Sequence, residues 1–360
     1  MAPSPVATLA TRARFIARQG ARVAWFAAHG EALKRLNRRL KAKLPENPRP
    51  FVPPSKPVPS QSELLAGIAA LFRRDLANVE AGIYPLPRGE FGSPGNFLSL
   101  SRHFFEDAPK VARRRAEGSH QEVYRETKAE KDSLPRYYRQ NFHFQTDGWL
   151  SDESARLYDF QVEVLFTGAT AAMRRQGLLP LAEILRQRDQ RKVAYADIAC
   201  GTGGLLAPAL AAFPRLKGVG VDLSEAYMNE ARSRLRPSEE RRATFISAPA
   251  EALPFGDESL DILSTVYLFH ELPPEVRRQV AAEFSRALKP GGRLIFIDSL
   301  QTGERPAFDG LLEVFPQLFH EPYFASYLSD DLDGIFAATG LRLASFDTAF
   351  LSRIAVYEKV

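Results

Sequence analysis

One stretch decides the fold: Val193-Ala194-Tyr195-Ala196-Asp197-Ile198-Ala199-Cys200-Gly201-Thr202-Gly203-Gly204. The pattern predicts a short apolar strand that ends at Asp197, then a turn rich in glycine, and then a helix over residues 205–213. Glycine lets the backbone approach a ligand closely, and the first amides of a helix favour an electron-rich ligand. The stretch therefore predicts one strand, turn and helix of a doubly wound α/β sheet.

A second strand with an acidic end follows at Gly218-Val219-Gly220-Val221-Asp222-Leu223-Ser224. An acid in this place accepts hydrogen bonds from the two hydroxyls of a ribose. The first turn lacks the G-x-G-x-x-G order that nicotinamide dinucleotides favour. The two segments predict a ligand that contains a ribose, and they disfavour a nicotinamide cofactor.

Together these segments resemble the class I methyltransferases that use S-adenosylmethionine, most closely the small-molecule branch that includes ubiquinone and menaquinone biosynthesis enzymes. Ala199 stands where glycine is commoner in that family, and a methyl group is tolerated there if this residue keeps an ordinary φ. The resemblance covers about residues 158–360. It implies a Rossmann-like α/β fold in which a seven-stranded, mostly parallel sheet carries helices on both faces.

The resemblance also implies which residues bind the cofactor. They are Asp197, Ala199, Gly201, Gly203, Asp222, Leu223, Ala250 and Tyr158. Pro249 replaces the aspartate that usually accepts from the adenine amine, whereas the amide of Ala250 can still donate to the ring. Residues 341–347 and 353–358 are expected to form a closing hairpin.

Catalysis of methyl transfer requires alignment of donor and acceptor and, for some acceptors, removal of one proton. His270 is the first candidate for the base or an acceptor anchor, because the resemblance places its loop beside the donor and imidazole titrates near neutrality. His143 and Glu271 are the next candidates. The alternative is that these side chains only hold the loops in place. A continuous helix is predicted from about Ser151 to Gln176.

The segment 299–328 is longer than a simple connection and is rich in aromatic residues. Connections of this length are usually lids or binding elements. We expect a lid over a small, apolar or aromatic acceptor, although a helix packed on the sheet would show similar spacing.

The positive charge is concentrated near the N-terminus. The whole chain carries +5, and residues 1–43 alone carry +9, which leaves −4 for the rest. A slightly acidic body makes nucleic-acid binding unlikely. The basic arm predicts a helix over about residues 8–44, either docked on the protein or lying on an anionic membrane surface.

Four segments are expected: a basic helical arm (1–44), a linker (45–59), a helical extension covering the active site (60–150) and the methyltransferase domain (151–360). The linker has seven prolines in fifteen residues, which excludes a helix. Ser60 and Glu63 have the spacing of a capping box, so a helix is predicted to begin there.

Several classes are disfavoured by composition. With one cysteine, Cys200, no internal disulfide can form, and without a Cys/His cluster we expect no metal. No apolar run reaches the roughly 20 residues of a membrane-spanning helix. The expected location is a reducing, cytoplasmic compartment, with peripheral membrane contact through the arm left open. The alternative functions are an RNA or protein methyltransferase docked through the arm, and a non-catalytic S-adenosylmethionine-binding protein.

Overall fold

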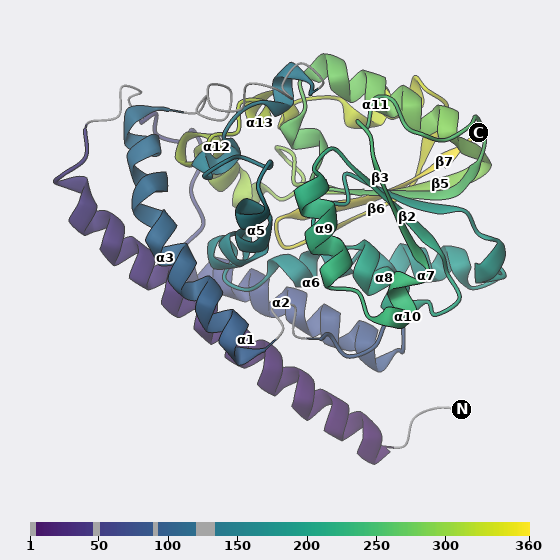
Figure 1. The fold of residues 1–360 in the computed structure, drawn as a ribbon, viewed down its shortest axis with the longest axis horizontal. Helices are drawn as coiled ribbons and strands as arrows, with labels where there is room; N and C mark the ends of the chain where they lie inside the picture. The colour runs from purple at the N-terminus through teal and green to yellow at the C-terminus, as the bar shows by residue number, and fades with distance from the viewer. Residues whose placement is uncertain (1–4, 46–50, 89–92, 120–133) are drawn as a thin grey trace.

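A seven-stranded sheet forms the centre of the computed structural model, which describes residues 5–45, 51–88, 93–119 and 134–360 (Figure 1). The strand order is β3-β2-β1-β4-β5-β7-β6, with β7 antiparallel to both of its neighbours and the remaining pairs parallel. The strands are β1 (Tyr195–Ile198), β2 (Gly218–Asp222), β3 (Ala243–Ser247), β4 (Leu260–Val266), β5 (Leu288–Ser299), β6 (Leu341–Ala349) and β7 (Ser352–Lys359). The predicted α/β sheet and its closing hairpin are confirmed.

Helices cover both faces of this sheet (Figure 1). Helix α8 contacts α7 and α10 on one face, and α11 and α14 contact each other on the opposite face. The helices are α1 (Pro5–Lys41), α2 (Gln61–Glu80), α3 (Pro94–Glu117), α5 (Asp152–Leu165), α6 (Thr170–Arg175), α7 (Leu178–Leu185), α8 (Leu206–Ala212), α9 (Glu225–Ser233), α10 (Pro237–Glu240), α11 (Pro274–Ala287), α12 (Asp309–Leu318), α13 (Phe324–Tyr327) and α14 (Leu332–Ala337). Short 3-10 turns are η2 (Arg136–Tyr138), η3 (Phe142–Phe144), η4 (Gln190–Lys192), η5 (Phe269–Glu271) and η6 (Pro306–Phe308).

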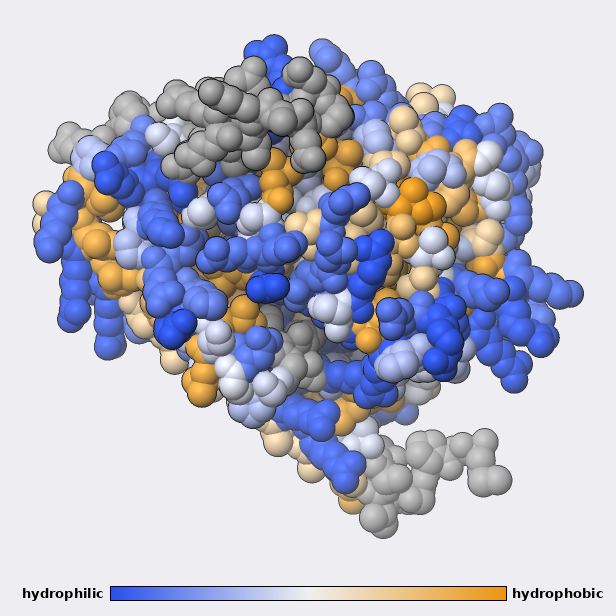
Figure 2. All heavy atoms as spheres, in the orientation of Figure 1, coloured by the Kyte–Doolittle hydropathy of each residue, from blue (hydrophilic) through white to orange (hydrophobic). Residues whose placement is uncertain are grey.

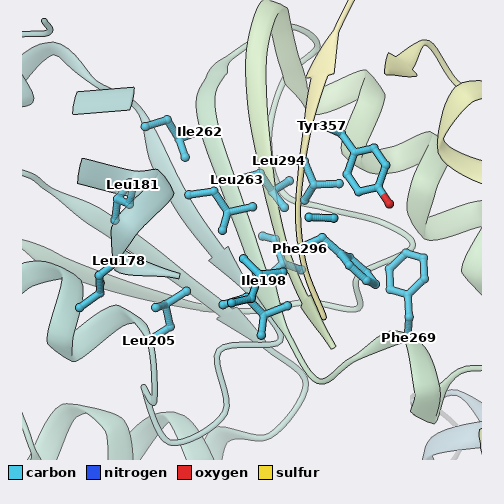
Figure 3. Packing of buried hydrophobic residues seen from close by; sticks show 14 of the residues in the cluster. Leu178, Leu181, Ile198, Leu205, Ile262, Leu263, Phe269, Leu294, Phe296 and Tyr357 are labelled. Atoms are coloured by element: carbon cyan, nitrogen blue, oxygen red, sulfur yellow. The ribbon is translucent and has the colours of Figure 1, made fainter. Parts of the chain in front are cut away.

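The main core lies where the central strands meet these helices, as Figure 3 shows for both faces of the sheet. Every residue of β1 is buried, as expected of a central parallel strand covered on both sides. Ile198, Leu263 and Phe296, from three different strands, have no exposed surface. Burial on both faces explains why the strands have continuous apolar runs, and it fixes the loops at their carboxyl ends.

The basic helix α1 docks on the protein, against α2, α3 and α5. Phe26 of α1 is completely buried in a small cluster of its own with Phe160 of α5. The guanidinium of Arg22 lies 2.6 Å from the carboxylate of the buried Glu163 and donates to the carbonyl of Gly168 at 3.1 Å. None of the described helices is both long enough and apolar enough to span a membrane.

The proline-rich segment before α2 is fixed to the body by polar contacts with α12. The hydroxyl of Ser55 donates to Glu313 at 2.7 Å, and Lys56 lies 2.5 Å from the buried Asp309. Helix α2 begins with the predicted capping box at Ser60. Residues 46–50 of the predicted linker lie outside the described residues.

The predicted continuous helix from Ser151 to Gln176 is wrong. The chain forms α5 and α6 instead, because Thr167 and Gly168 take positive φ values of 55° and 82° between them. A left-handed pair ends a right-handed helix. The break allows the two helices to change direction, and both then contribute side chains to the site described below.

Candidate active site

A cavity of about 760 Å³ lies at the carboxyl ends of β1, β2 and β4. The strand order reverses at β1, and loops that diverge at such a point leave a crevice. At the end of β2, the carboxylate of Asp222 accepts hydrogen bonds from the amides of Gly201 and Ser224, both at 2.8 Å. These two bonds join the glycine turn to the second strand.

A second cavity, of about 750 Å³, adjoins the first. Its apolar wall comes from α5, α6, α12, α13 and the turn before β7, and consists of Val162, Phe166, Met173, Leu311, Leu312, Phe315, Phe324 and Leu351. Four residues line both cavities: Trp149, Tyr158, Tyr267 and Glu271. The two spaces therefore meet at a boundary of three aromatic rings and one carboxylate.

A cluster of titratable side chains forms one end of the second cavity. It contains His143, His270, Glu271 and Glu321, and all four line the cavity. His143 Nε2 lies 3.3 Å from Glu271 Oε1, and His143 Nδ1 lies 3.5 Å from Glu321 Oε1. His270 Nδ1 lies 2.5 Å from Asp298 Oδ1 at the end of β5. The cluster combines residues that are separated by up to 178 positions in the sequence.

Asp159 of α5 also supports the glycine turn. Its carboxylate accepts hydrogen bonds from the hydroxyl of Thr202 and from Arg174, both at 2.6 Å, and it pairs with Arg234, which follows α9. Burial would raise the pKa of Asp159, but Arg234 and Arg174 hold that pKa well below its usual range. The turn thus rests on a buried carboxylate that pairs with two arginines.

The sequence comparisons match methyltransferases. A family model described as a methyltransferase domain matches residues 196–292. A ubiquinone/menaquinone biosynthesis C-methyltransferase of Syntrophotalea carbinolica is 38% identical over 120 residues, which are 33% of this chain and 48% of that relative. The chain carries a class I methyltransferase domain.

Other relatives of this methyltransferase domain match more of the chain at lower identity. The demethylmenaquinone methyltransferase of Thermotoga maritima is 29% identical over 182 residues, covering 51% of this chain and 73% of that protein. Among solved structures, the pyocyanin biosynthetic protein PhzM covers 75% of this chain and 74% of its own, with a TM-score of 0.47 and 16% identity. The match to the Syntrophotalea protein spans about half the length of that relative.

The first cavity of the methyltransferase domain fits S-adenosylmethionine, the cofactor of this family. A carboxylate can accept about four hydrogen bonds, and the two amides use two positions on Asp222, which leaves acceptors for ribose hydroxyls. Leu223, Ala250 and Leu272 add apolar lining suited to a base. The domain would hold the cofactor between these residues and the glycine turn.

The structure brings six of the eight predicted cofactor residues to this cavity. They are Ala199, Gly201, Asp222, Leu223, Ala250 and Tyr158. Asp197 lies beneath the turn, where it accepts a hydrogen bond from Ser264 at 2.6 Å and burial raises its pKa to about 7. Gly203 lines a different cavity, on the far side of the turn. Neither residue lines the first cavity.

Ala199 does not meet the condition of an ordinary φ under which a methyl group is tolerated at this position. Its φ is +53°, in the left-handed region. Gly201 and Gly203 share this conformation, with φ of 53° and 76°, because the turn curls tightly around the end of β1. A side chain in this region costs about 1–2 kcal/mol. The methyl group of Ala199 is therefore a local strain in the turn.

The three predicted catalytic candidates, His143, His270 and Glu271, lie together in the titratable cluster. The carboxylate of Asp298 raises the pKa of His270 to about 10 in spite of burial, which acts in the opposite direction. This shift favours a charged imidazolium and the role of anchor over that of base. Burial would also lower the pKa of His143, but Glu321 and Glu271 raise it.

Sequence analysis missed Glu321, Trp149 and Tyr267 as residues of the site. Glu321 follows α12 inside the predicted lid, and burial raises its pKa to about 7. Tyr267 takes a positive φ of 58° at the end of β4, and its hydroxyl lies 2.7 Å from that of Ser352. One sequence signal could have indicated Glu321 as a site residue. It forms a polar pair with His320 inside an otherwise aromatic segment.

Proposed function

We propose that the protein transfers a methyl group from S-adenosylmethionine to a small, apolar or aromatic acceptor. The observation that carries this proposal is the boundary of Trp149, Tyr158, Tyr267 and Glu271 between the two cavities. A methyl group moves in line from one molecule to the other, so the two sites must adjoin. The second cavity is then the acceptor site, and we call it the acceptor cavity.

The lining of the acceptor cavity supports the class of acceptor. Phe166, Phe315 and Phe324 suit a flat hydrocarbon or ring, and the titratable cluster suits a polar group at one end of it. The quinone methyltransferases among the relatives are named for ring compounds of this kind. We propose a phenolic or quinone-like acceptor whose polar group faces the cluster.

The residues at the boundary and in the titratable cluster would have different roles in the transfer. Bound S-adenosylmethionine supplies an electrophilic methyl group on sulfur. Trp149 and Tyr158 confine the acceptor at the boundary and exclude water from it. His270, fixed by Asp298, anchors the polar group of the acceptor, and His143 and Glu271 provide nitrogen and oxygen atoms that accept a proton.

The first test is isothermal titration of the full-length protein with S-adenosylmethionine and with its demethylated product. We expect binding to the wild type and a loss of affinity of about 10–100-fold in Asp222→Ala, which removes hydrogen bonds to a charged group. Asp257→Ala, at an exposed acid on the same domain, is the control and should bind normally. Absence of binding to the wild type would contradict the proposal.

An acceptor screen follows from a positive titration. Phenolic and quinone-like compounds would be incubated with methyl-labelled cofactor, and transfer would be followed by mass. Binding without transfer to any compound in a broad panel would favour a non-catalytic binding protein. Transfer to RNA or protein but to none of the small compounds would move the acceptor to a macromolecule.

We also propose peripheral membrane contact through residues 1–44. Leu9 and Ile16 of α1 are 65% and 57% exposed, and Arg14 between them in the sequence is exposed as well. Figure 2 shows hydrophilic and hydrophobic spheres interleaved along this helix. Such a surface suits anionic lipid. Replacing Arg14, Arg39 and Lys41 with glutamate should reduce co-sedimentation with phosphatidylserine vesicles. Equal recovery of variant and wild type would refute this contact.

A further inference from the structure

Three side chains of the titratable cluster have the arrangement of metal ligands. His143 of η3, Glu271 of η5 and Glu321 after α12 each offer one ligand atom, and these atoms lie within 4.8 Å of one another. Ligand bonds of about 2.1 Å place the ligands of one ion roughly 3–4 Å apart. One ion can bind only one ring nitrogen of His143, whose Nε2 faces Glu271 at 3.3 Å and whose Nδ1 faces Glu321 at 3.5 Å. The three ligand atoms, which lie within 4.8 Å of one another, would draw closer around a bound ion.

The carboxylate oxygens of this trio are poorly satisfied by the protein. Both oxygens of Glu321 and Oε2 of Glu271 are buried, and they accept no hydrogen bond from any residue that the structure describes. Glu321 is only 3% exposed. Two buried carboxylates beside each other cost free energy unless a positive charge offsets them. His143 and His270 face these carboxylates at 3.3–3.6 Å, yet three carboxylate oxygens still accept no hydrogen bond from the described residues.

The backbone holds one ligand in a conformation that a merely packed residue rarely keeps. His143 takes a φ of +54°, and its amide donates to the carbonyl of His320 at 3.2 Å. This hydrogen bond ties η3 directly to the residue before Glu321. Left-handed residues other than glycine gather at functional sites, where the surroundings hold them.

The donor set selects the class of cation. One imidazole nitrogen and two carboxylate oxygens suit Zn²⁺ and Mn²⁺, whereas Mg²⁺ prefers oxygen ligands alone and keeps most of its water. We propose that His143, Glu271 and Glu321 bind one divalent transition-metal cation, Zn²⁺ or Mn²⁺. All three ligands line the acceptor cavity, so the remaining coordination positions face the space that the acceptor would occupy.

This site also narrows the acceptor, an extension that rests on the proposed function. An acceptor with a hydroxyl group beside its reacting atom can place that oxygen in an open position of the cation. Coordination lowers the pKa of the O–H group. Its proton is released to solvent, because His143 and Glu271 are ligands when the cation is bound and no longer accept that proton. The metal site therefore favours phenols and enols over hydrocarbons without a polar group.

The test uses full-length protein that has been freed of metal with a chelator and dialysed. Titration with ZnCl₂ and with MnCl₂, without any cofactor, should show one site per chain. Glu321→Gln keeps the shape of the side chain and removes its charge, so it should weaken binding by about 100-fold. Glu304→Gln is the matched control on the same connection. Its carboxylate pairs with Arg353, and binding should be unchanged.

Thermal melting separates a lost site from a damaged fold. We expect Zn²⁺ to raise the Tm of the wild type and to leave that of Glu321→Gln unchanged, while the metal-free variant melts no lower than the metal-free wild type. If Glu321→Gln does not fold, metal binding is measured in Glu271→Gln instead. Electron paramagnetic resonance spectra of Mn²⁺ added to the wild type then report whether the cation is bound. Absence of a stoichiometric site in the wild type, or equal affinity in the folded variants, would overturn the proposal.

The metal proposal and the proposed function fail separately. S-adenosylmethionine titration of the same metal-free sample reports on the donor site alone. Cofactor binding without metal binding overturns only the metal site, and metal binding without cofactor binding overturns only the proposed function.

Discussion

The hydroxyl of Thr202 in the glycine turn donates a hydrogen bond to Asp159 of α5 over 2.6 Å. The same carboxylate pairs with Arg174 and Arg234. Residues that precede the sheet in the chain thus support the turn that faces the cofactor. The stability of the turn depends on a charge that lies outside the glycine motif.

Asp159→Asn should destabilise the fold in a way that depends on pH. The pKa of Asp159 is lowered in the folded state, so its contribution is complete above the unfolded value of about 3.9 and is lost as pH falls below it. At pH 7 the variant should lose about 3 kcal/mol, because two buried guanidinium groups lose their partner. Urea denaturation between pH 7 and pH 3.5 should show that the difference in free energy of unfolding between the wild type and Asp159→Asn becomes smaller as the pH falls.

The control for this prediction is Asp152→Asn, at the exposed start of the same helix. It should match the wild type across the range. A gap between Asp159→Asn and wild type that stays constant down to pH 3.5 would show that the loss comes from packing and not from charge.

Ala199→Gly should stabilise the protein. The left-handed conformation costs an alanine about 1–2 kcal/mol, which glycine avoids in the folded state. Glycine loses more conformational freedom on folding, and this offsets about 0.5–1 kcal/mol of the stabilisation. We expect a net increase of about 0.5–1 kcal/mol in the free energy of unfolding, measured in urea. The matched change Ala211→Gly, in helix α8, should cost about 1 kcal/mol.

Phe315→Ala should weaken acceptor binding and spare the cofactor. Phe315 lines the acceptor cavity, and a lost aromatic contact of about 1.5–3 kcal/mol corresponds to a roughly 10–100-fold rise in KM. Phe319→Ala should have a smaller effect, because Phe319 packs on Phe315 at 4.7 Å without lining the cavity. Unchanged kinetics in both variants would remove the 299–328 segment from acceptor binding.

Arg22→Met should loosen the docking of α1. The change removes the guanidinium that lies 2.6 Å from the buried Glu163, and the loss of one partner of a buried ion pair costs about 3 kcal/mol. Arg12→Met is the control, because the pair of Arg12 with Glu80 is exposed and should contribute nothing measurable. Proteolysis of α1 in native buffer should accelerate only in the first variant.

The sequence was sufficient for the sheet because the decisive signals are local. Strand, turn and acid follow one another within the segment that ends at Asp222, and the hairpin of β6 and β7 is contiguous. The helix break at Thr167 and Gly168 was missed, because apolar residues continue at helical spacing through it. The strained φ of Ala199 was also missed, since backbone geometry there is set by contacts between β1 and β2.

The sequence predicted the part of the site near the glycine motif but not how the titratable cluster is assembled. Residues near the glycine motif carry a family pattern, whereas the titratable cluster is assembled from three distant segments. His143 and Glu321 share a wall only because η3 and the segment after α12 are joined through the backbone of His320. No periodicity or spacing indicates such a meeting, so the trio of possible metal ligands emerges from the three-dimensional structure.

Strand β7 lies between β5 and β6, although it is the last of the seven strands to be synthesised. While a ribosome is still making residues 352–359, β5 has a free edge and β6 has no partner in the sheet. The nascent chain thus exposes an unpaired apolar strand until residues 352–359 have emerged, the period in which a chaperone would protect it best.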